Sequence, residues 1–273
     1  IEVNFPQAVP DSAGIPTSVS EDMLIAPFND LLAVETILAE QRDIAAIIVE
    51  PLQRIIPPTT GFLQGLRSLC DKYQILLIFD EIVTGFRLAY GGAQERYGVI
   101  PDICTLGKII GGGFPLAAVG ANSEIMKHFD KAIVGSEGWL MQLGTLSGNP
   151  IASVAGLKTM EILQRPGQYQ KLRQIGKRLQ EIQSDNLTKE GIDHQIVGDE
   201  TLFDVIFTNR NCVDYRSTKH DEPTKAQKYN KTLREQGILK APTKLYPSLA
   251  VSDLDIEKTN QAVITAVQTL AAS

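Results

Sequence analysis

The stretch ILLIFDEI, residues 75–82, places two acids directly after five consecutive apolar residues. An apolar run without alternation is typical of a strand buried on both faces of a parallel sheet. Similar runs occur at residues 44–52, 102–106 and 116–121, and segments with helical spacing of apolar residues occur at 30–41 and 61–73. This alternation predicts an α/β fold with a mostly parallel sheet and helices on both faces.

The second half of the chain has a different pattern. Two long helical segments, at residues 147–164 and 168–183, are followed by an alternating stretch at 194–208 that is typical of antiparallel strands. Helical patterns return at residues 223–237 and after Ser252, a residue type that favours a helix N-cap. We therefore predict a large α/β domain over residues 1–163 and a small C-terminal α+β domain over 164–273.

Composition excludes several classes of function. The net charge is −6 without a long basic run, and no apolar stretch approaches the ~20 residues that span a bilayer, so neither nucleic acid nor a membrane is an expected partner. The three cysteines are isolated, which favours a reducing, cytoplasmic environment over a disulfide scaffold. The three histidines are widely separated, and we expect no metal site.

Two charged residues stand at the ends of predicted strands. Asp80 follows residues 75–79, and Lys108 follows 102–106 and precedes three glycines. In parallel α/β sheets, ligands bind at the carboxyl ends of strands. Each residue also has a plain structural alternative: Asp80 as a helix cap or ion-pair partner of Arg87, and Lys108 as a solvent-facing side chain. If both are buried together, a lysine with a depressed pKa and a carboxylate form the pair that pyridoxal phosphate (PLP) requires.

Four motifs in register make the sequence similar to class III aminotransferases, which have PLP fold type I. They are IIVEPL, IFDEIVTGFR, YGVIPDICTLGKIIGGGFPLAAVGA and GTLSGNP. The match is dense over residues 44–160 and most resembles the branch that contains glutamate-1-semialdehyde 2,1-aminomutase. In this family a phosphate-binding loop and a ring-stacking aromatic lie well upstream of the VEP motif. No such sequence precedes residue 44, so the chain is expected to lack the N-terminal part of the fold and to leave some core exposed.

The resemblance implies a role for each matching residue. Lys108 is the lysine that forms the Schiff base with the cofactor and carries the proton, and Asp80 pairs with the pyridine nitrogen. Val83 packs against the ring face. Thr145 contacts the cofactor phosphate of the neighbouring subunit, which implies a homodimer with shared active sites. Glu50 lies near the site, either behind the residues that touch the ligand or in a purely structural role.

The sequence departs from the family pattern where substrates are chosen. Ornithine- and 4-aminobutyrate-type relatives carry a glutamate soon after the EP motif and a C-terminal arginine, and this chain has neither in EPLQRIIPPTTGF or APTKLYPSLA. It also lacks an acidic segment that the aminomutase carries before its counterpart of SLA. Arg54, Lys244 and Tyr246 are candidate substrate contacts, with surface or packing roles as the alternative.

These observations predict a PLP-dependent aminotransferase that moves an amino group between an amino acid or amine and a keto acid. The first alternative is the aminomutase, which exchanges amino and carbonyl groups within one molecule. The second is a non-enzymatic piece of a larger synthase, which would bind cofactor or a partner without turnover.

Overall fold

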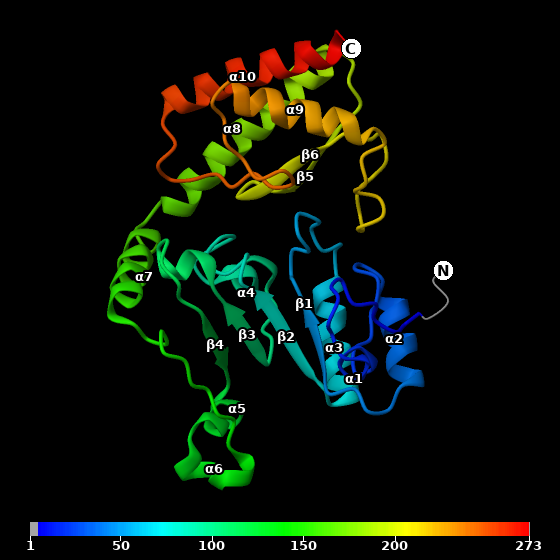
Figure 1. Cartoon of the computed structure of the whole chain (residues 1–273), viewed down its shortest axis with the longest axis vertical. Coiled ribbons are helices and arrows are strands. Elements are labelled where there is room, and N and C mark those ends of the chain that lie inside the picture. Colours follow the sequence, from blue (N-terminus) through cyan, green and yellow to red (C-terminus); the bar gives the residue numbers. More distant parts are fainter. Residues whose placement is uncertain (1–4, 273) are drawn as a thin grey trace.

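The computed structural model describes residues 5–272, and its centre is a mixed four-stranded sheet (Figure 1). Strands β1 (Ala46–Val49), β2 (Leu76–Glu81) and β3 (Ile103–Leu106) run parallel, and β4 (Ala118–Ala121) pairs antiparallel with β3. All four strands lie within the apolar runs found in the sequence. The predicted α/β fold with a mostly parallel sheet is confirmed.

One face of the sheet is covered by helices α2 (Leu31–Glu40) and α3 (Phe62–Tyr73). Their apolar side chains pack on Leu77 and Phe79 of β2, both fully buried. Asp30 caps α2 by accepting a hydrogen bond from the Ala33 amide. This layer orients β2, so that its alternate residues Ile78 and Asp80 point to the other face.

The opposite face of the sheet remains largely uncovered by the described chain. Ile48 is 56% exposed, and Leu76 and Val119 on the same face are also exposed. These exposed apolar residues agree with the expectation that part of the core would be exposed. The short helix α1 (Thr17–Glu21) has no buried residue.

Gly112, the middle one of the three glycines at residues 111–113, allows close packing of a helix. The 3₁₀ turn η1 (Lys108–Gly111) leads into them, and α7 (Pro150–Leu163) crosses this segment. A Cβ atom on Gly112 would lie 2.8 Å from the carbonyl oxygen of Ala155, and one on Gly156 would lie 2.3 Å from that of Ile110. The backbone therefore approaches α7 at a distance that larger residues would prevent.

Between β4 and α7 the chain forms a projecting group of short helical segments. They are α5 (Ser123–Met126), η2 (Lys127–Phe129) and α6 (Lys131–Gly138). Asn149, and not Thr145 or Ser147, caps α7, because its side chain accepts the Ala152 amide at 2.9 Å.

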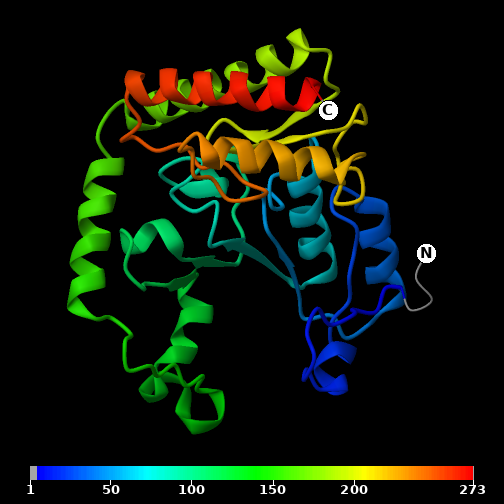
Figure 2. The same ribbon diagram turned by 45° about the horizontal axis from the view of Figure 1, so that its top comes forward.

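The C-terminal part packs three long helices on a two-stranded antiparallel ribbon. The helices are α8 (Gln168–Lys189), α9 (Pro223–Glu235) and α10 (Asp253–Ala271), and the ribbon is β5 (Gln195–Asp199) with β6 (Leu202–Ile206). Helices α9 and α10 run side by side over a shared apolar core (Figure 2). Ser252 forms the predicted N-cap of α10 within a capping box. Helix α8 continues six residues beyond the predicted end.

An ionic cluster joins the C-terminal part to the sheet region. Asp199 accepts hydrogen bonds from Arg173 of α8 at 3.0 Å and from Arg96 at 3.1 Å, the latter in α4 (Gly92–Tyr97). Arg173 also donates to the carbonyl oxygen of Leu88. Because Arg96 and Leu88 belong to the sheet region, this cluster fixes how the two parts meet. Among residues 5–272, no helix is long and apolar enough to cross a membrane.

Candidate active site

Three parallel strands end at one edge of the sheet, and a polar residue follows or ends each of them. Glu50 follows β1, Asp80 lies near the end of β2, and Lys108 follows β3 after Gly107. In Figure 1 these strand ends point toward the C-terminal part. All three residues line one open cavity of about 290 Å³, which brings the sequence-predicted Asp80 and Lys108 together.

Asp80 is held by two hydrogen bonds to one carboxylate oxygen. Its Oδ1 accepts the Ile82 amide at 3.1 Å and the Thr105 hydroxyl at 3.2 Å. Among the described residues, Oδ2 has no hydrogen-bond donor and Arg87 is not its ion-pair partner. No helix starts at Asp80 either. Asp80 is therefore neither a helix cap nor the ion-pair partner of Arg87. One oxygen of a fixed, half-buried carboxylate is left for a donor in the cavity.

Lys108 has an unusual backbone conformation for a lysine. Its φ angle is 49°, in the left-handed region that costs a residue other than glycine of the order of 1 kcal/mol. Its neighbours Gly107 and Ile110 are buried, whereas Lys108 itself is exposed. In the described chain Lys108 is therefore open to solvent and is not buried together with Asp80. The turn that holds it is fixed on α7 and β3, and its ammonium has no acceptor among residues 5–272.

Val83 and Glu50 complete the predicted set in this cavity. Val83 is half-buried, lines the cavity and packs against the apolar cluster of Leu52, Ile55 and Leu88. It presents an aliphatic surface next to Asp80. Glu50 uses Oε2 to accept the Arg54 backbone amide at 3.3 Å, so it supports the turn that follows β1 as well as lining the cavity.

Thr145 is the one predicted cofactor residue outside this cavity. It is exposed in the turn before α7, where Ser147 donates its backbone amide to the Gly144 carbonyl at 3.0 Å. Within this chain it does not meet Asp80 or Lys108.

Two residues that bear on the site were not singled out in the sequence. Thr105 bonds Asp80, and it lies directly opposite Asp80 in the β2–β3 register. Glu81 is 1% exposed and accepts from the Ala93 amide, the Thr84 hydroxyl and the Gln94 amide. The signal for Thr105 was a hydroxyl at the matching position of the next strand. The signal for Glu81 was a second acid directly after a buried run.

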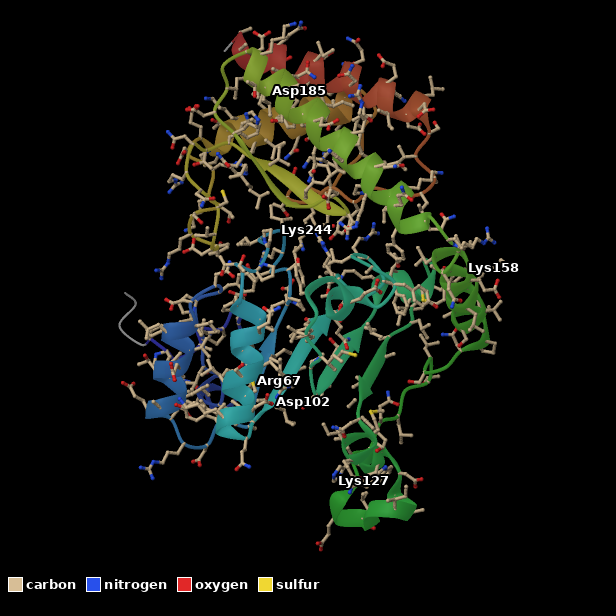
Figure 3. The ribbon with its side chains drawn as sticks, turned by 180° about the vertical axis from the view of Figure 1, so that it is seen from behind. Arg67, Asp102, Lys127, Lys158, Asp185 and Lys244 are labelled. Carbon is tan, nitrogen blue, oxygen red and sulfur yellow. The ribbon has the colours of Figure 1, made fainter. Side chains whose placement is uncertain are left out.

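Of the candidate substrate contacts, the structure separates two from the third. Arg54 and Lys244 line the cavity with Asp80 and Lys108, and Figure 3 labels Lys244 at the junction between the sheet region and the C-terminal part. The Arg87 guanidinium instead lies over the Tyr246 ring, with its central carbon 5.6 Å from the ring centroid. Arg87 also donates a hydrogen bond to the Pro247 carbonyl at 2.8 Å. Tyr246 therefore packs against Arg87 and is not among the residues that line the cavity.

Comparison with known proteins gives a consistent result. Residues 4–267 match the family model for aminotransferase class-III. The chain is 41% identical over 261 residues to the glutamate-1-semialdehyde 2,1-aminomutase 2 of Brevibacillus brevis. The aligned region covers 93% of this chain and 60% of the relative. The chain thus spans about 60% of that curated relative's length.

Solved structures agree with the sequence relatives. An omega-transaminase from Sphaerobacter thermophilus superposes with a TM-score of 0.91 at 33% identity, covering all of this chain and 63% of that one. A β-phenylalanine aminotransferase from Variovorax paradoxus superposes with a TM-score of 0.82 at 27% identity, covering 91% of this chain and 58% of that one. The fold is that of fold-type I PLP-dependent transferases. The chain belongs to the class III aminotransferase family.

Proposed function

We propose that this protein is a PLP-dependent aminotransferase that moves an amino group between an amino acid or amine and a keto acid. The observation that carries the proposal is that Asp80, Val83 and Lys108 line one cavity. Within the described part of the chain, one Asp80 oxygen has no donor and the Lys108 ammonium has no acceptor, and Val83 adds an aliphatic wall. These three features suit the pyridine nitrogen, the aldehyde and the ring face of the cofactor, respectively.

Bound pyridoxal phosphate supplies a carbonyl that takes up the amino group and a ring that accepts electrons when a bond to the substrate carbon breaks. Asp80 would hold a proton on the pyridine nitrogen through Oδ2, while the Thr105 hydroxyl and Ile82 amide fix Oδ1. Lys108 would hold the cofactor carbonyl through Nζ, and the same amine, when free, would be the base that accepts a proton from the substrate carbon and the acid that donates it again. Lys108 lines the cavity from a turn in which its backbone is left-handed.

We further propose that the protein is a homodimer in which Thr145 contacts the cofactor phosphate of the other subunit. An apolar stripe on α7 supports a partner there, because Ile151, Val154 and Leu157 are each at least 65% exposed. Leu146, beside Thr145, is also 65% exposed. The Thr145 hydroxyl thus lies next to the surface that a second copy would cover.

One experiment separates transamination from the alternatives. The PLP-loaded protein is given an amino donor with and without a keto acid, and the new amino acid is measured. An aminotransferase forms it only when both are present. The aminomutase is the second candidate because of the 41% identity to the Brevibacillus protein. It would isomerise glutamate-1-semialdehyde without a second substrate. No conversion in either assay, with PLP bound, would leave the non-enzymatic reading.

A further inference from the structure

We propose that Arg87 is a positioning residue for the cofactor site. Its side chain ties the C-terminal segment, residues 244–249, to the turn that follows β2, and so fixes the side of the cavity that the C-terminal part supplies. Among the described residues that line the cavity, Lys244 is the one that comes from the C-terminal part. The inference rests on the proposed function, because the cofactor on Lys108 is what this side of the cavity would shield from solvent.

Arg87 stands on a turn that is fixed to β2. Its backbone amide donates to the Thr84 carbonyl at 3.1 Å, and the Thr84 hydroxyl donates to the Glu81 carboxylate at 3.1 Å. Glu81 is the last residue of β2 and is 1% exposed. The same turn contains Val83, which lines the cavity with Asp80. The base of Arg87 is therefore continuous with the strand that carries the predicted partner of the pyridine nitrogen.

The Arg87 side chain reaches from this turn to the C-terminal segment. Its Nη1 donates to the Pro247 carbonyl at 2.8 Å, and the guanidinium carbon lies 5.6 Å from the centroid of the Tyr246 ring. These two partners are the second and third residues after Lys244. One side chain thus connects the strand end that carries Asp80 with the segment that carries Lys244.

The other side-chain and strand-like anchors of the C-terminal segment lie within the C-terminal part. The Leu245 amide donates to the carbonyl of Phe203 in β6 at 2.7 Å, and Lys171 of α8 donates to the Leu249 carbonyl at 3.1 Å. Among the described residues, Arg87 is the one in the sheet region that hydrogen-bonds the segment. Without Arg87 the segment keeps its place on the C-terminal part but has no hydrogen bond to the sheet region.

The charge of Arg87 has no carboxylate partner in the described part of the chain. Arg87 is half-buried, and burial lowers the pKa of its guanidinium. By contrast, Arg67 and Arg173 each have a carboxylate at 2.8 Å or less. Burying a charge without a counter-ion destabilises a fold, so stability alone does not explain an arginine at this position. A link between two sides of the cavity does explain it.

The test replaces Arg87 and follows the C-terminal segment by hydrogen exchange. Arg87→Met keeps the length of the side chain and removes the donor. A hydrogen bond from a charged donor changes an equilibrium about tenfold or more, so we expect the Leu245 amide to exchange about ten times faster. The amides of α10 should be unchanged. Arg87→Lys keeps a charged donor and should restore part of the protection, and Arg42→Met, at an exposed residue, is the matched control.

A second measurement follows the cavity without turnover. The PLP-loaded protein is treated with borohydride, and the loss of visible absorbance gives the rate at which the reagent reaches the cofactor. We expect Arg87→Met to be reduced about ten times faster than the wild type, with Arg87→Lys in between. Tyr169→Phe should be reduced at the wild-type rate. Its hydroxyl donates to the Phe86 carbonyl of the same turn at 2.8 Å, but it comes from α8 and not from the C-terminal segment.

Unchanged exchange at Leu245 in Arg87→Met would overturn the inference. Faster exchange with an unchanged rate of reduction would make Arg87 merely structural, and faster exchange across the whole C-terminal part would assign it to stability alone; either result also overturns the inference. Equally fast reduction of Tyr169→Phe would do the same, because any loosening of the junction would then open the cavity. If the wild type takes up no PLP, the proposed function fails, while the exchange measurement still decides whether Arg87 holds the segment.

Discussion

Replacing Glu81 tests how the end of β2 is held. The Glu81 carboxylate is 1% exposed and accepts the Ala93 amide at 2.6 Å, the Thr84 hydroxyl at 3.1 Å and the Gln94 amide at 2.9 Å. Glu81→Leu keeps the volume and leaves the two buried donors, on Ala93 and Thr84, without an acceptor. The half-buried Gln94 can turn toward water.

The cost follows from those two donors. A buried donor without a partner costs about 1–3 kcal/mol, so the loss lies at about 2–6 kcal/mol. In a chain of this size that lowers the melting temperature by roughly 2–4 °C for each kcal/mol. Glu81→Gln keeps one acceptor oxygen but loses the charge, and we expect about 1–2 kcal/mol. The exposed Glu137→Gln is the matched control, with a change below about 0.5 kcal/mol.

The assay is urea unfolding followed by circular dichroism, with wild type, both Glu81 variants and the control measured together. Removing the charge also removes the penalty for burying it, and in some proteins that gain exceeds the loss of the hydrogen bonds. If Glu81→Leu is as stable as the wild type or more stable, three hydrogen bonds do not compensate burial, and the account of this strand end is wrong.

Three further predictions concern the site, the dimer and the junction. Asp80→Asn should keep the melting temperature, because the amide oxygen can still accept both hydrogen bonds. Activity should fall at least a hundredfold if the lost charge is worth ~3–5 kcal/mol at the pyridine nitrogen. Near-normal rates would make Asp80 merely structural. Mixing inactive Lys108→Ala and Thr145→Ala protomers should restore activity through one intact site per mixed dimer, and no recovery after confirmed subunit exchange would refute the shared site. Burial tends to raise the pKa of Asp199, but hydrogen bonds from Thr201 and Arg173 lower it overall. The stabilisation by Asp199 is therefore present above the unfolded pKa of about 4 and is lost as pH falls through the lower folded value. Asp199→Asn should make the free energy of unfolding, measured in urea, depend less on pH between about pH 2 and 5, and an unchanged slope would contradict this.

Much of the fold could be predicted from local pattern. Unbroken apolar runs located all four strands, and Ser252 located the start of α10, because burial and capping act over a few residues. The end of α8 was missed since its last turns, with Ser184, Asp185 and Asn186, have little apolar signal, although Leu187 packs into the C-terminal core. The domain boundary near residue 163 stays a prediction.

The site was predictable in type but not in detail. Strand ends pointed to Asp80 and Lys108, because parallel strands share one carboxyl edge. Lys108 is exposed and has a positive φ angle, and its residue type predicts neither. The meeting of Arg54 with Lys244 depends on how two turns 190 positions apart dock, and pattern within either segment carries no information about it.

The most direct test of the aminotransferase account is where the cofactor attaches. The protein is loaded with PLP, reduced with borohydride and digested, and the modified peptide is identified by mass spectrometry, with Lys108→Arg treated in parallel. The account predicts label on Lys108 in the wild type and none at that position in the variant. Label on Lys244, which lines the same cavity, or on any other lysine in place of Lys108 would contradict it.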